Sequence, residues 1–544
     1  MEGEVLLITY DPLWLLPLFL YAETHYRFRY FFSFLRKAEP ELIADAPFRV
    51  EPRTNIPILF LAKDAHRYPC RLLDVSVTIR QEGHPDRKQN LLHRPISLNQ
   101  YWWWRIFSID PHHCRGWIDL DVEFTISVDG KTVSYKNDNF RTSTRKSLRV
   151  YVSAHPLPTF PGLSYGDCHV HSNYTDDQVE FGAPIAAGVT LAPAMGLSFF
   201  AATDHSYDLD DEPEHYLRND PGLSKWRTLN KEVDHHNDSG SRCLVLRGEE
   251  ASCRNSESHT VHMVVLGEKT FFPGSGDSAE RWFRTKSELT ATTIAQSVSS
   301  GLTFAAHPME HVPLLQKMLL GRGQWQLDDL LSPGLTGVQF LNGTIGSGYE
   351  KGKQLWTRAL LTGARLVLIA GNDAHGNFNR FRQLGIPFLT IRESGMQIFG
   401  KMRTGVFVRG KKTETTILHA LRAGNSIITD GPIARMDIRT RNGAQLGTMG
   451  GHYTAREATI EVEAGSSQEF GVIEHIRLFC GRIGESAEEL VFEDRPAAYK
   501  SKIRFPLAIE SPLYVRAEIT TSMKGTFDGL PHFCLTNPLW ISPS

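Results

Sequence analysis

The sequence predicts an α/β central region that lies between two β-rich modules. In residues 156–405, strand-like runs alternate with helix-like segments, which is typical of parallel strands joined by helices. Residues 1–155 and 406–544 hold short β-like runs between turn residues, the pattern of β-sandwiches. The 544 residues, 41% hydrophobic and 22% charged, suit about three or four globular domains of roughly 150 residues. We therefore expect domains over 1–155, 156–405 and 406–544.

The first module is predicted from β-propensity and from turn signals such as Asp129-Gly130. The predicted strands are 56–62, 72–79, 102–108 and 118–128. Before them lies an apolar run, 13–21, which is too short to span a bilayer and follows acidic rather than basic residues. We expect this run to be a buried edge segment or a dimer contact, so a homo-oligomer is one expectation and a membrane partner is not.

The central region carries near-continuous apolar runs, as expected for strands buried on both faces. Predicted strands are 165–171, 198–204, 243–249, 302–306, 337–341 and 365–370. Predicted helices between them are 184–195, 224–236, 287–300, 312–320 and 349–362. The alternation predicts a parallel sheet with helices as crossovers.

The last module opens with a linker helix. Thr413 is a plausible N-cap for a helix over 414–423, and Gly424 is its stop. Short β-like runs follow at 426–429, 434–439, 458–464, 475–479 and 513–519. This pattern predicts a second β-sandwich-like unit.

Nine candidate metal ligands identify the chemistry of the central region. They are His169, His171, Asp176, His205, Glu250, His262, His307, Asp373 and His375. All except His262, which opens its own strand, lie at or just past the end of a predicted strand, where chemistry sits in α/β barrels. His169 and His171 share one face because strand side chains alternate with period two. Nitrogen and oxygen ligands without a thiolate suit two or three divalent ions, such as Mn²⁺, Zn²⁺ or Fe²⁺, that activate water for hydrolysis.

One alternative ligand is visible in the sequence itself. His259 lies three residues before His262 and competes with it. Any of these histidines taken alone would be read as a packed or solvated residue. It is the ordered series, each member following a strand, that predicts a metal centre.

The motif series resembles the PHP superfamily, named after its polymerase and histidinol-phosphatase members, over residues 164–378. The motifs are Asp167-Cys168-His169-Val170-His171-Ser172, Thr175-Asp176, Thr203-Asp204-His205, Gly248-Glu249-Glu250, His262 to Gly267, Ala306-His307-Pro308 and Asp373-Ala374-His375. The family pattern has glycine where this chain has Asp177, so Asp177 competes with Asp176. Leu418 to Gly424 and Thr429-Asp430-Gly431-Pro432 resemble the branch of carbaryl- and carbofuran-type carbamate hydrolases, whose members carry β-rich flanks.

The resemblance implies a distorted (βα)7 barrel and up to three ions. The first ion would be held by His169, His171, Glu250 and Asp373. The second would be held by Glu250, His262 and His307, with Glu250 bridging, and the third by Asp176, His205 and His375. A bridging carboxylate brings two ions to about 3.5–4 Å, where they share a hydroxide nucleophile.

The candidate catalytic residues are Glu250, Asp204 and Arg380. Asp204 and Asp167 are expected to orient the histidines. Arg380, with Arg382, could clamp a phosphate in bidentate fashion or form surface pairs.

We expect a metal-dependent hydrolase of a small ester or phosphoester, with phosphoester hydrolysis leading. Hydrolysis of a carbamate, carboxylic ester or amide is the first alternative, and a carbohydrate- or protein-binding scaffold with a secondary barrel is the second. The formal net charge of −2 argues against nucleic acid as a partner. Seven scattered cysteines without paired spacing fit a reducing, cytoplasmic setting.

Overall fold

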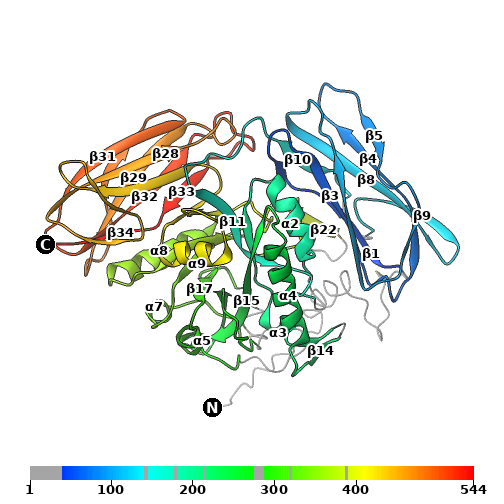
Figure 1. Cartoon of the computed structure of the whole chain (residues 1–544), viewed down its shortest axis with the longest axis horizontal. Coiled ribbons are helices and arrows are strands. Elements are labelled where there is room, and N and C mark those ends of the chain that lie inside the picture. Colours follow the sequence, from blue (N-terminus) through cyan, green and yellow to red (C-terminus); the bar gives the residue numbers. More distant parts are fainter. Residues whose placement is uncertain are drawn as a thin grey trace, which may run out of the picture.

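A computed structural model describes residues 39–139, 145–176, 181–213, 215–274, 287–312, 321–385 and 390–544, together with Leu314 and Lys317. The apolar run at 13–21, Asp177 and most of the predicted helix 312–320 therefore lie outside the described residues. Figure 1 shows the N-terminal strands on one side, the C-terminal strands on the other, and the central region between and below them.

The N-terminal region consists of two sheets that pack around one apolar core. A three-stranded antiparallel sheet contains β1 (Glu41–Asp45), β3 (Ile56–Lys63) and β7 (Trp102–Ile109). The second sheet contains β2 (Arg49–Val50), β10 (Leu148–Val152), β8 (Gly116–Val128), β4 (Cys70–Arg80) and β5 (Arg87–Asn90), with β6 (Ile96–Leu98) and β9 (Lys131–Lys136) beside them. Phe60 and Phe124 meet edge to face across the two sheets, with ring centroids 5.0 Å apart.

The central strands form one end of a 16-stranded sheet. Three of them pair in parallel, β11 (Leu163–His171), β12 (Phe199–Ala202) and β15 (Leu244–Arg254). The next strand, β16 (Thr260–Leu266), is antiparallel to both of its neighbours. Parallel pairing resumes in β17 (Leu302–Ala306), β18 (Gly337–Asn342) and β19 (Val367–Gly371), and β20 (Ala374–His375) pairs with β11.

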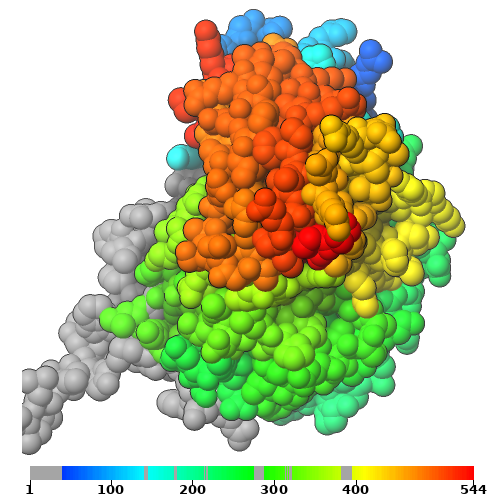
Figure 2. Space-filling view, turned by 90° about the vertical axis from the view of Figure 1, so that its left-hand side faces the viewer, coloured from blue at the N-terminus to red at the C-terminus, as the bar shows by residue number. Residues whose placement is uncertain are grey.

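The same sheet continues into the C-terminal region. Its further strands are β23 (Arg403–Phe407), β24 (Ser426–Thr429), β33 (Phe533–Thr536), β32 (Leu513–Thr521), β29 (Ile473–Arg482), β30 (Glu489–Asp494), β27 (His452–Thr454) and β34 (Leu539–Ser542). A four-stranded sheet lies beside them, made of β26 (Gln445–Thr448), β25 (Ile433–Arg439), β28 (Glu457–Gly465) and β31 (Lys500–Ala508). Figure 2 shows this region, in orange, covering one side of the green central residues.

The helices and the small hairpins occupy the connections. The helices are α2 (Ile185–Ala194), α3 (Ser206–Leu209), α4 (Ser224–Asp238), α5 (Ala291–Ser297), α7 (Leu327–Leu330), α8 (Ser347–Leu361) and α9 (Glu414–Arg422). The hairpins are β13 (Asp211–Glu212) with β14 (His215–Asn219), and β21 (Phe381–Gly385) with β22 (Thr390–Ser394). No helix in the described part of the chain combines the length and the apolar character needed to cross a bilayer.

The predicted fold class is wrong. A (βα)7 barrel needs a helix after each strand, whereas β15 and β16 form an antiparallel hairpin, and strands but no helix occur among the described residues between β19 and β23. The sheet also runs on through β23 into the C-terminal strands. The protein is therefore mostly β, and it has neither a TIM-like barrel nor the α/β PHP-domain architecture that the resemblance implied.

The physical reason lies in what covers the buried strands. Trp356 of α8 belongs to the same core cluster as Tyr514 and Trp540, which come from the C-terminal strands β32 and β34. Strand side chains thus cover part of a face where the apolar runs led us to expect crossover helices. Most of the individual predicted strands are nevertheless present, and the predicted Thr413 cap of α9 is confirmed, since its side chain accepts a hydrogen bond from Thr416 N.

Candidate metal centre

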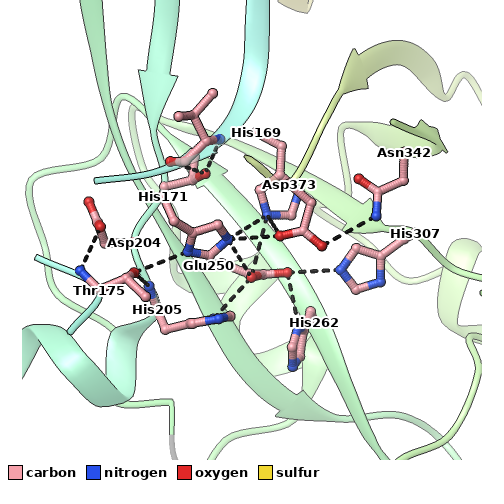
Figure 3. Close-up of polar contacts among 12 residues, drawn as sticks. His169, His171, Thr175, Asp204, His205, Glu250, His262, His307, Asn342 and Asp373 are labelled. Carbon is pink, nitrogen blue, oxygen red and sulfur yellow. Dashed lines mark hydrogen bonds and ion pairs between the residues drawn. The ribbon is translucent and has the colours of Figure 1, made fainter. Parts of the chain in front are cut away.

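The two histidines of the His-x-His motif end β11 and point to the same side of the sheet (Figure 3). Both are buried, and their Nε2 atoms are 3.2 Å apart. The period-two alternation of a strand places His169 and His171 on one face and sends the intervening Val170 to the other. This part of the centre is positioned as the sequence predicted.

Glu250 and His262 come from the β15–β16 hairpin. In the antiparallel register Ser252 is opposite His262, so Glu250, two residues from Ser252, shares the face of the His262 ring. Glu250 Oε1 lies 2.8 Å from His262 Nδ1. His259, the alternative ligand, has a 37% exposed side chain and lies beside Glu257 rather than in the cluster.

Four further predicted ligands follow the ends of central strands. His205 follows β12, His307 follows β17, Asp373 follows β19, and His375 ends the short strand β20. His307 and Asp373 have positive φ angles of 29° and 52°, a conformation that side-chain-bearing residues adopt uncommonly. Such backbone strain clusters at functional sites, where the surrounding structure holds it.

One glycine makes the approach of β19 to β11 possible. A Cβ added at Gly371 would lie 2.3 Å from His169 Cβ and 2.8 Å from His169 N. Two residues later, Asp373 N donates a hydrogen bond of 2.8 Å to His169 O. The position of Asp373 relative to the His-x-His motif therefore depends on glycine at position 371.

Glu250 lies at the centre of the cluster, with imidazole nitrogens facing both of its oxygens (Figure 3). Its Oε1 is 2.8 Å from His262 Nδ1 and 3.0 Å from His307 Nε2. Its Oε2 is 3.0 Å from His205 Nδ1, 3.3 Å from His171 Nε2 and 3.4 Å from His169 Nε2. A second carboxylate oxygen, Asp373 Oδ1, lies 3.0 Å from His171 Nε2 and 3.6 Å from His169 Nε2.

Neighbouring side chains orient the two rings of the motif. His169 Nδ1 is 2.8 Å from Gln339 Oε1, and His171 Nδ1 is 3.1 Å from the Thr175 hydroxyl. Because each Nδ1 is engaged, each Nε2 is left to face the carboxylates. This is the arrangement that fixes ring orientation in metal-binding histidines.

The Asp373 carboxylate is held from its outer side. Asn342 Nδ2 and Gln397 Nε2 donate to Asp373 Oδ2 at 3.3 and 3.1 Å. Gln339 Nε2 donates to Asn342 Oδ1 at 3.0 Å, which joins this support to the His169 ring. Oδ1 is left facing the histidines.

The electrostatic balance of the cluster favours ionised carboxylates. Burial alone would raise the pKa of Glu250, but His262 and His169 hold it well below its usual range. Burial likewise opposes ionisation of Asp373, and His169 and His171 lower its pKa well below its usual range. Burial lowers the pKa of His169, and Glu250 and Asp373 outweigh this effect and raise it to about 9. The pKa of His171 is instead lowered, by burial and by the neighbouring His375 and His205. The buried carboxylates stay charged because the protonated His169 and the hydrogen bonds from the surrounding imidazoles favour their charged form.

The cluster fits divalent ions. Three sets of ligand atoms lie within 4.8 Å of one another: His169, His171, Glu250 and Asp373; His205, Glu250 and His262; and His171, His205 and His375. Glu250 Oε2 is buried and makes no hydrogen bond to the described residues, although three ring nitrogens face it. A buried carboxylate oxygen without a hydrogen bond is costly unless a cation occupies the space beside it. Imidazole and carboxylate donors suit Zn²⁺, Mn²⁺ or Fe²⁺.

Two of the nine predicted ligands, His307 and Asp176, are absent from these sets. His307 faces Glu250 at 3.0 Å, whereas Asp176 is engaged elsewhere. Asp176 Oδ1 lies 2.5 Å from Lys63 Nζ, and Asp176 Oδ2 accepts a hydrogen bond from the Tyr101 hydroxyl. Both partners belong to the N-terminal region, Lys63 at the end of β3 and Tyr101 just before β7. Burial opposes the charge of Lys63, but Asp176 and Glu41 raise its pKa above the usual value, so Lys63 is cationic.

The predicted catalytic residues outside the cluster have structural contacts. Asp204 accepts hydrogen bonds from Ser172 N at 2.7 Å and Thr175 N at 2.8 Å, so it shapes the turn that carries Thr175. Asp167 is fully buried and accepts from Asn372 Nδ2 at 2.7 Å. Arg380 is 7% exposed and donates to the Lys146 carbonyl. The Arg382 side chain lies outside the described residues.

One arginine that sequence reasoning missed contacts the cluster. Arg322 Nη2 lies 2.9 Å from His262 Nε2 and 3.4 Å from His262 Nδ1. Arg322 lies beside the start of β16, where Thr260 N donates to Gly321 O and Gly323 N donates to Thr260 O. The only local signal was its glycine-flanked setting, Gly321-Arg322-Gly323, which does not reveal a partner 60 residues away.

Comparisons with known proteins leave the family open. No family model matches the chain, and no curated protein does. Among solved structures, the chain aligns with a Bacteroides fragilis protein described as a β-galactosidase at 9% identity, over 93% of this chain and 74% of that one, with a TM-score of 0.19. A β-glucuronidase of glycoside hydrolase family 2 aligns at 8% identity, over 93% and 62%, with a TM-score of 0.17.

A third alignment is of the same kind. It is to a β-D-mannosidase from Dictyoglomus thermophilum, at 9% identity, over 88% of this chain and 64% of that one, with a TM-score of 0.21. The chain thus spans less than two thirds of the glucuronidase and of the mannosidase. Superpositions at this level establish neither a common fold nor a common activity, so a function must be argued from the centre itself.

Proposed function

We propose that this chain is a metal-dependent hydrolase whose centre is organised by Glu250. The observation that carries the proposal is that five imidazoles face the two oxygens of this one buried carboxylate, at 2.8–3.4 Å. A carboxylate placed in this way can bridge two ions. The ordered ligand motifs support the same chemistry, because they resemble those of the PHP superfamily on a β-rich scaffold that differs from the implied barrel.

The residues of the chain have separate tasks in such a centre. When bound, divalent ions would supply a hydroxide nucleophile at neutral pH and offset charge on the substrate. His169, His171, Glu250 and Asp373 would hold one ion, while Glu250, His205 and His262 would hold another. His307 Nε2 is 3.0 Å from Glu250 Oε1, the oxygen that also faces His262, and would be a further ligand for the second ion.

Arg322 favours an anionic substrate and so a phosphoester. A neutral imidazole has one acceptor nitrogen, and a metal ion would need that nitrogen of His262. An ion bound to His262 therefore competes with Arg322 for the ring, and the Arg322 guanidinium stays beside the centre. A phosphoryl oxygen is the acceptor that a guanidinium fork fits best.

The first test is hydrolysis by the manganese-loaded protein of three p-nitrophenyl substrates: a phosphate monoester, a phosphate diester and a carboxylic ester. His169→Ala is the blank, and His84→Ala, an exposed histidine, is the matched control. We expect turnover of a phosphate ester that is lost in H169A and kept in H84A. Turnover of the carboxylic ester alone would favour the carbamate and ester alternative. No hydrolysis of any of the three substrates would contradict the proposal.

Arg322→Met separates the two substrate classes. Loss of a charge-assisted hydrogen bond costs about 1.5–3 kcal/mol, so kcat/KM for the phosphate ester should fall about 10- to 100-fold. The carboxylic ester, which carries no anionic group, should change little. Arg441→Met, at an 87% exposed position, is the control. Equal losses on both esters would mean that Arg322 acts only by supporting His262.

A further inference from the structure

Solvent reaches the centre most freely beside His307 and Asp373. These two side chains are 14% and 13% exposed, whereas the other predicted ligand side chains are at most 9% exposed. Figure 3 shows Asn342 next to both of them. A substrate would therefore enter on this side, and the side chains around this opening would contact the part of the substrate that points away from the ions.

Glu310 is a carboxylate at this opening. Its Oε2 lies 3.6 Å from His307 Nδ1 and accepts a hydrogen bond of 3.3 Å from Asn342 Nδ2, which also donates to Asp373 Oδ2. Among the described residues these are the only side-chain partners of the carboxylate, and Oε1 has none. The side chain is 54% exposed. The carboxylate thus adjoins the centre and remains open to a molecule that enters it.

The backbone around Glu310 is fixed. Glu310 N donates to His307 O at 3.1 Å, and Gln324 Nε2 donates to Glu310 O at 2.9 Å. The start of α8 packs closely against the same residue, since a Cβ added at Gly348 would lie 3.2 Å from Glu310 Cα. A side chain on such a held backbone can contact a substrate with little further loss of conformational freedom.

We propose that Glu310 determines which alcohol a phosphomonoester substrate carries, favouring an ammonium or hydroxyl group there and disfavouring a second anion. This inference rests on the proposed metal-dependent hydrolase, whose centre would hold the phosphoryl group. Hydrolysis breaks the P–O bond to the alcohol, adds a hydroxide from water to phosphorus and gives the remaining proton of that water to the alcohol oxygen. A carboxylate beside the alcohol accepts hydrogen bonds from donor groups and repels a like charge.

The test uses three small phosphomonoesters whose alcohol parts differ in charge: phosphoethanolamine, n-propyl phosphate and phosphoglycolate. The manganese-loaded full-length protein is assayed by release of inorganic phosphate. The readout is the ratio of kcat/KM for phosphoethanolamine to kcat/KM for phosphoglycolate. Comparing this ratio between wild type and variant cancels the intrinsic reactivity of each ester and the fraction of active protein.

We expect Glu310→Gln to lower the ratio about tenfold, because an ammonium loses its counter-charge and a carboxylate is no longer repelled. The uncharged propyl ester should change little. Glu310→Asp, which keeps the charge, should retain most of the wild-type ratio.

Glu257→Gln is the matched control. Glu257 lies outside the cluster, is 55% exposed, and has its Oε2 3.5 Å from His259 Nδ1 and 3.4 Å from Gln326 Nε2, so E257Q should leave the ratio unchanged. An unchanged ratio in E310Q, or an equal fall on all three esters, overturns the inference and leaves the proposed function intact. Hydrolysis of a p-nitrophenyl substrate without any of the three esters does the same. A wild-type protein that hydrolyses none of these compounds overturns both.

Discussion

The geometry of the centre depends on Gly371 having no side chain. The backbone of β19 comes so close to His169 that any Cβ at this position would overlap the His169 Cβ, at 2.3 Å. The neighbouring atom belongs to the stem of a buried side chain and to its backbone, so neither can move aside cheaply. The distance between the two histidines of β11 and Asp373 is set by this contact.

Gly371→Ala should therefore disrupt the centre with a moderate effect on folding. We expect manganese affinity to fall at least tenfold and turnover to fall with it, because His169 and Asp373 are pushed apart. Isothermal titration with Mn²⁺ measures the first effect. Gly346→Ala, at a position where an added Cβ meets nothing within 4 Å, is the control. Unchanged affinity in G371A would show that His169 and Asp373 do not hold the same ion.

Some individual roles could be predicted from the sequence and others could not. His262 was favoured over His259, and the hairpin register places His262 in the cluster. Asp176 was predicted as a metal ligand, and its pairing with Lys63 was not foreseen because it is a contact between residues far apart in the chain. Arg322 was missed for the same reason. A local sequence pattern predicts which residues share a face of one helix or strand. It does not predict which side chains from distant parts of the chain pack against that face.

Between strands, the turn after β24 and the start of β33 are joined by a buried histidine. His532 is 3% exposed, with Nδ1 3.0 Å from Asp430 Oδ2 and Nε2 3.3 Å from Asp528 Oδ1. Burial lowers its pKa, but the hydrogen bond to Asp430 and the contact with the Asp528 carboxylate outweigh burial and raise the pKa to about 9. The protonated ring thus bridges two carboxylates of the C-terminal region.

The sign of the resulting pH dependence follows from the raised pKa. The folded protein binds the proton more tightly than the unfolded chain, whose histidine pKa is about 6.5. The stabilisation is complete below about pH 6.5 and is lost as the pH rises through about 9, at most about 3 kcal/mol. Urea unfolding between pH 6 and 10 measures how the free energy of unfolding depends on pH. We expect His532→Gln to flatten this dependence and His84→Gln, at an exposed histidine, to leave it unchanged. An unchanged slope in H532Q would contradict the assignment.

At the level of strands and helices, the sequence predicted where strands occur better than it predicted which elements cover them. The runs for β17, β24 and β32 lie where strands were expected. What covers them was predicted wrongly, since an apolar run shows that both faces of a strand are buried and not whether helices or other strands bury them. The C-terminal strands that pack against α8 are encoded more than 100 residues after it.

Across the whole chain, one apolar core joins the three regions. The same cluster contains Leu59 of β3, Phe200 of β12 and Ile476 of β29. The predicted boundaries near residues 155 and 405 stay predictions, and this shared core leads us to expect that the central region would not fold well alone.

A buried ion pair connects the N-terminal region to the C-terminal region. Arg49 of β2 donates from Nη2 to Glu469 Oε2 at 2.9 Å and forms a second hydrogen bond from Nε to Oε1, and both side chains are at most 2% exposed. Ser153 Oγ donates to the same carboxylate at 2.6 Å. Trp117 also reaches the C-terminal region, donating from Nε1 to Phe527 O at 2.7 Å.

Arg49 also pairs with Glu51, a less buried carboxylate, at 2.5 Å. Glu469→Gln should destabilise the protein by about 3 kcal/mol, because it removes the more deeply buried of the two counter-charges of a buried guanidinium. Chemical denaturation measures this loss. Glu123→Gln breaks a pair with Lys88 whose side chains are 50% and 57% exposed, and should cost less than about 1 kcal/mol. Equal effects of the two substitutions would mean that Arg49 is held by Glu51 alone.

The separation of Arg49 from Glu469 along the chain also affects how the protein folds during its synthesis. The two residues are 420 positions apart, and ribosomes add about 5–20 residues per second, so Arg49 waits roughly 20–80 s for this partner. Strand β11 similarly waits for β23 before its free edge is paired. During synthesis the nascent chain therefore exposes an unpaired strand edge and an incomplete apolar core, and both favour aggregation until its last strands emerge.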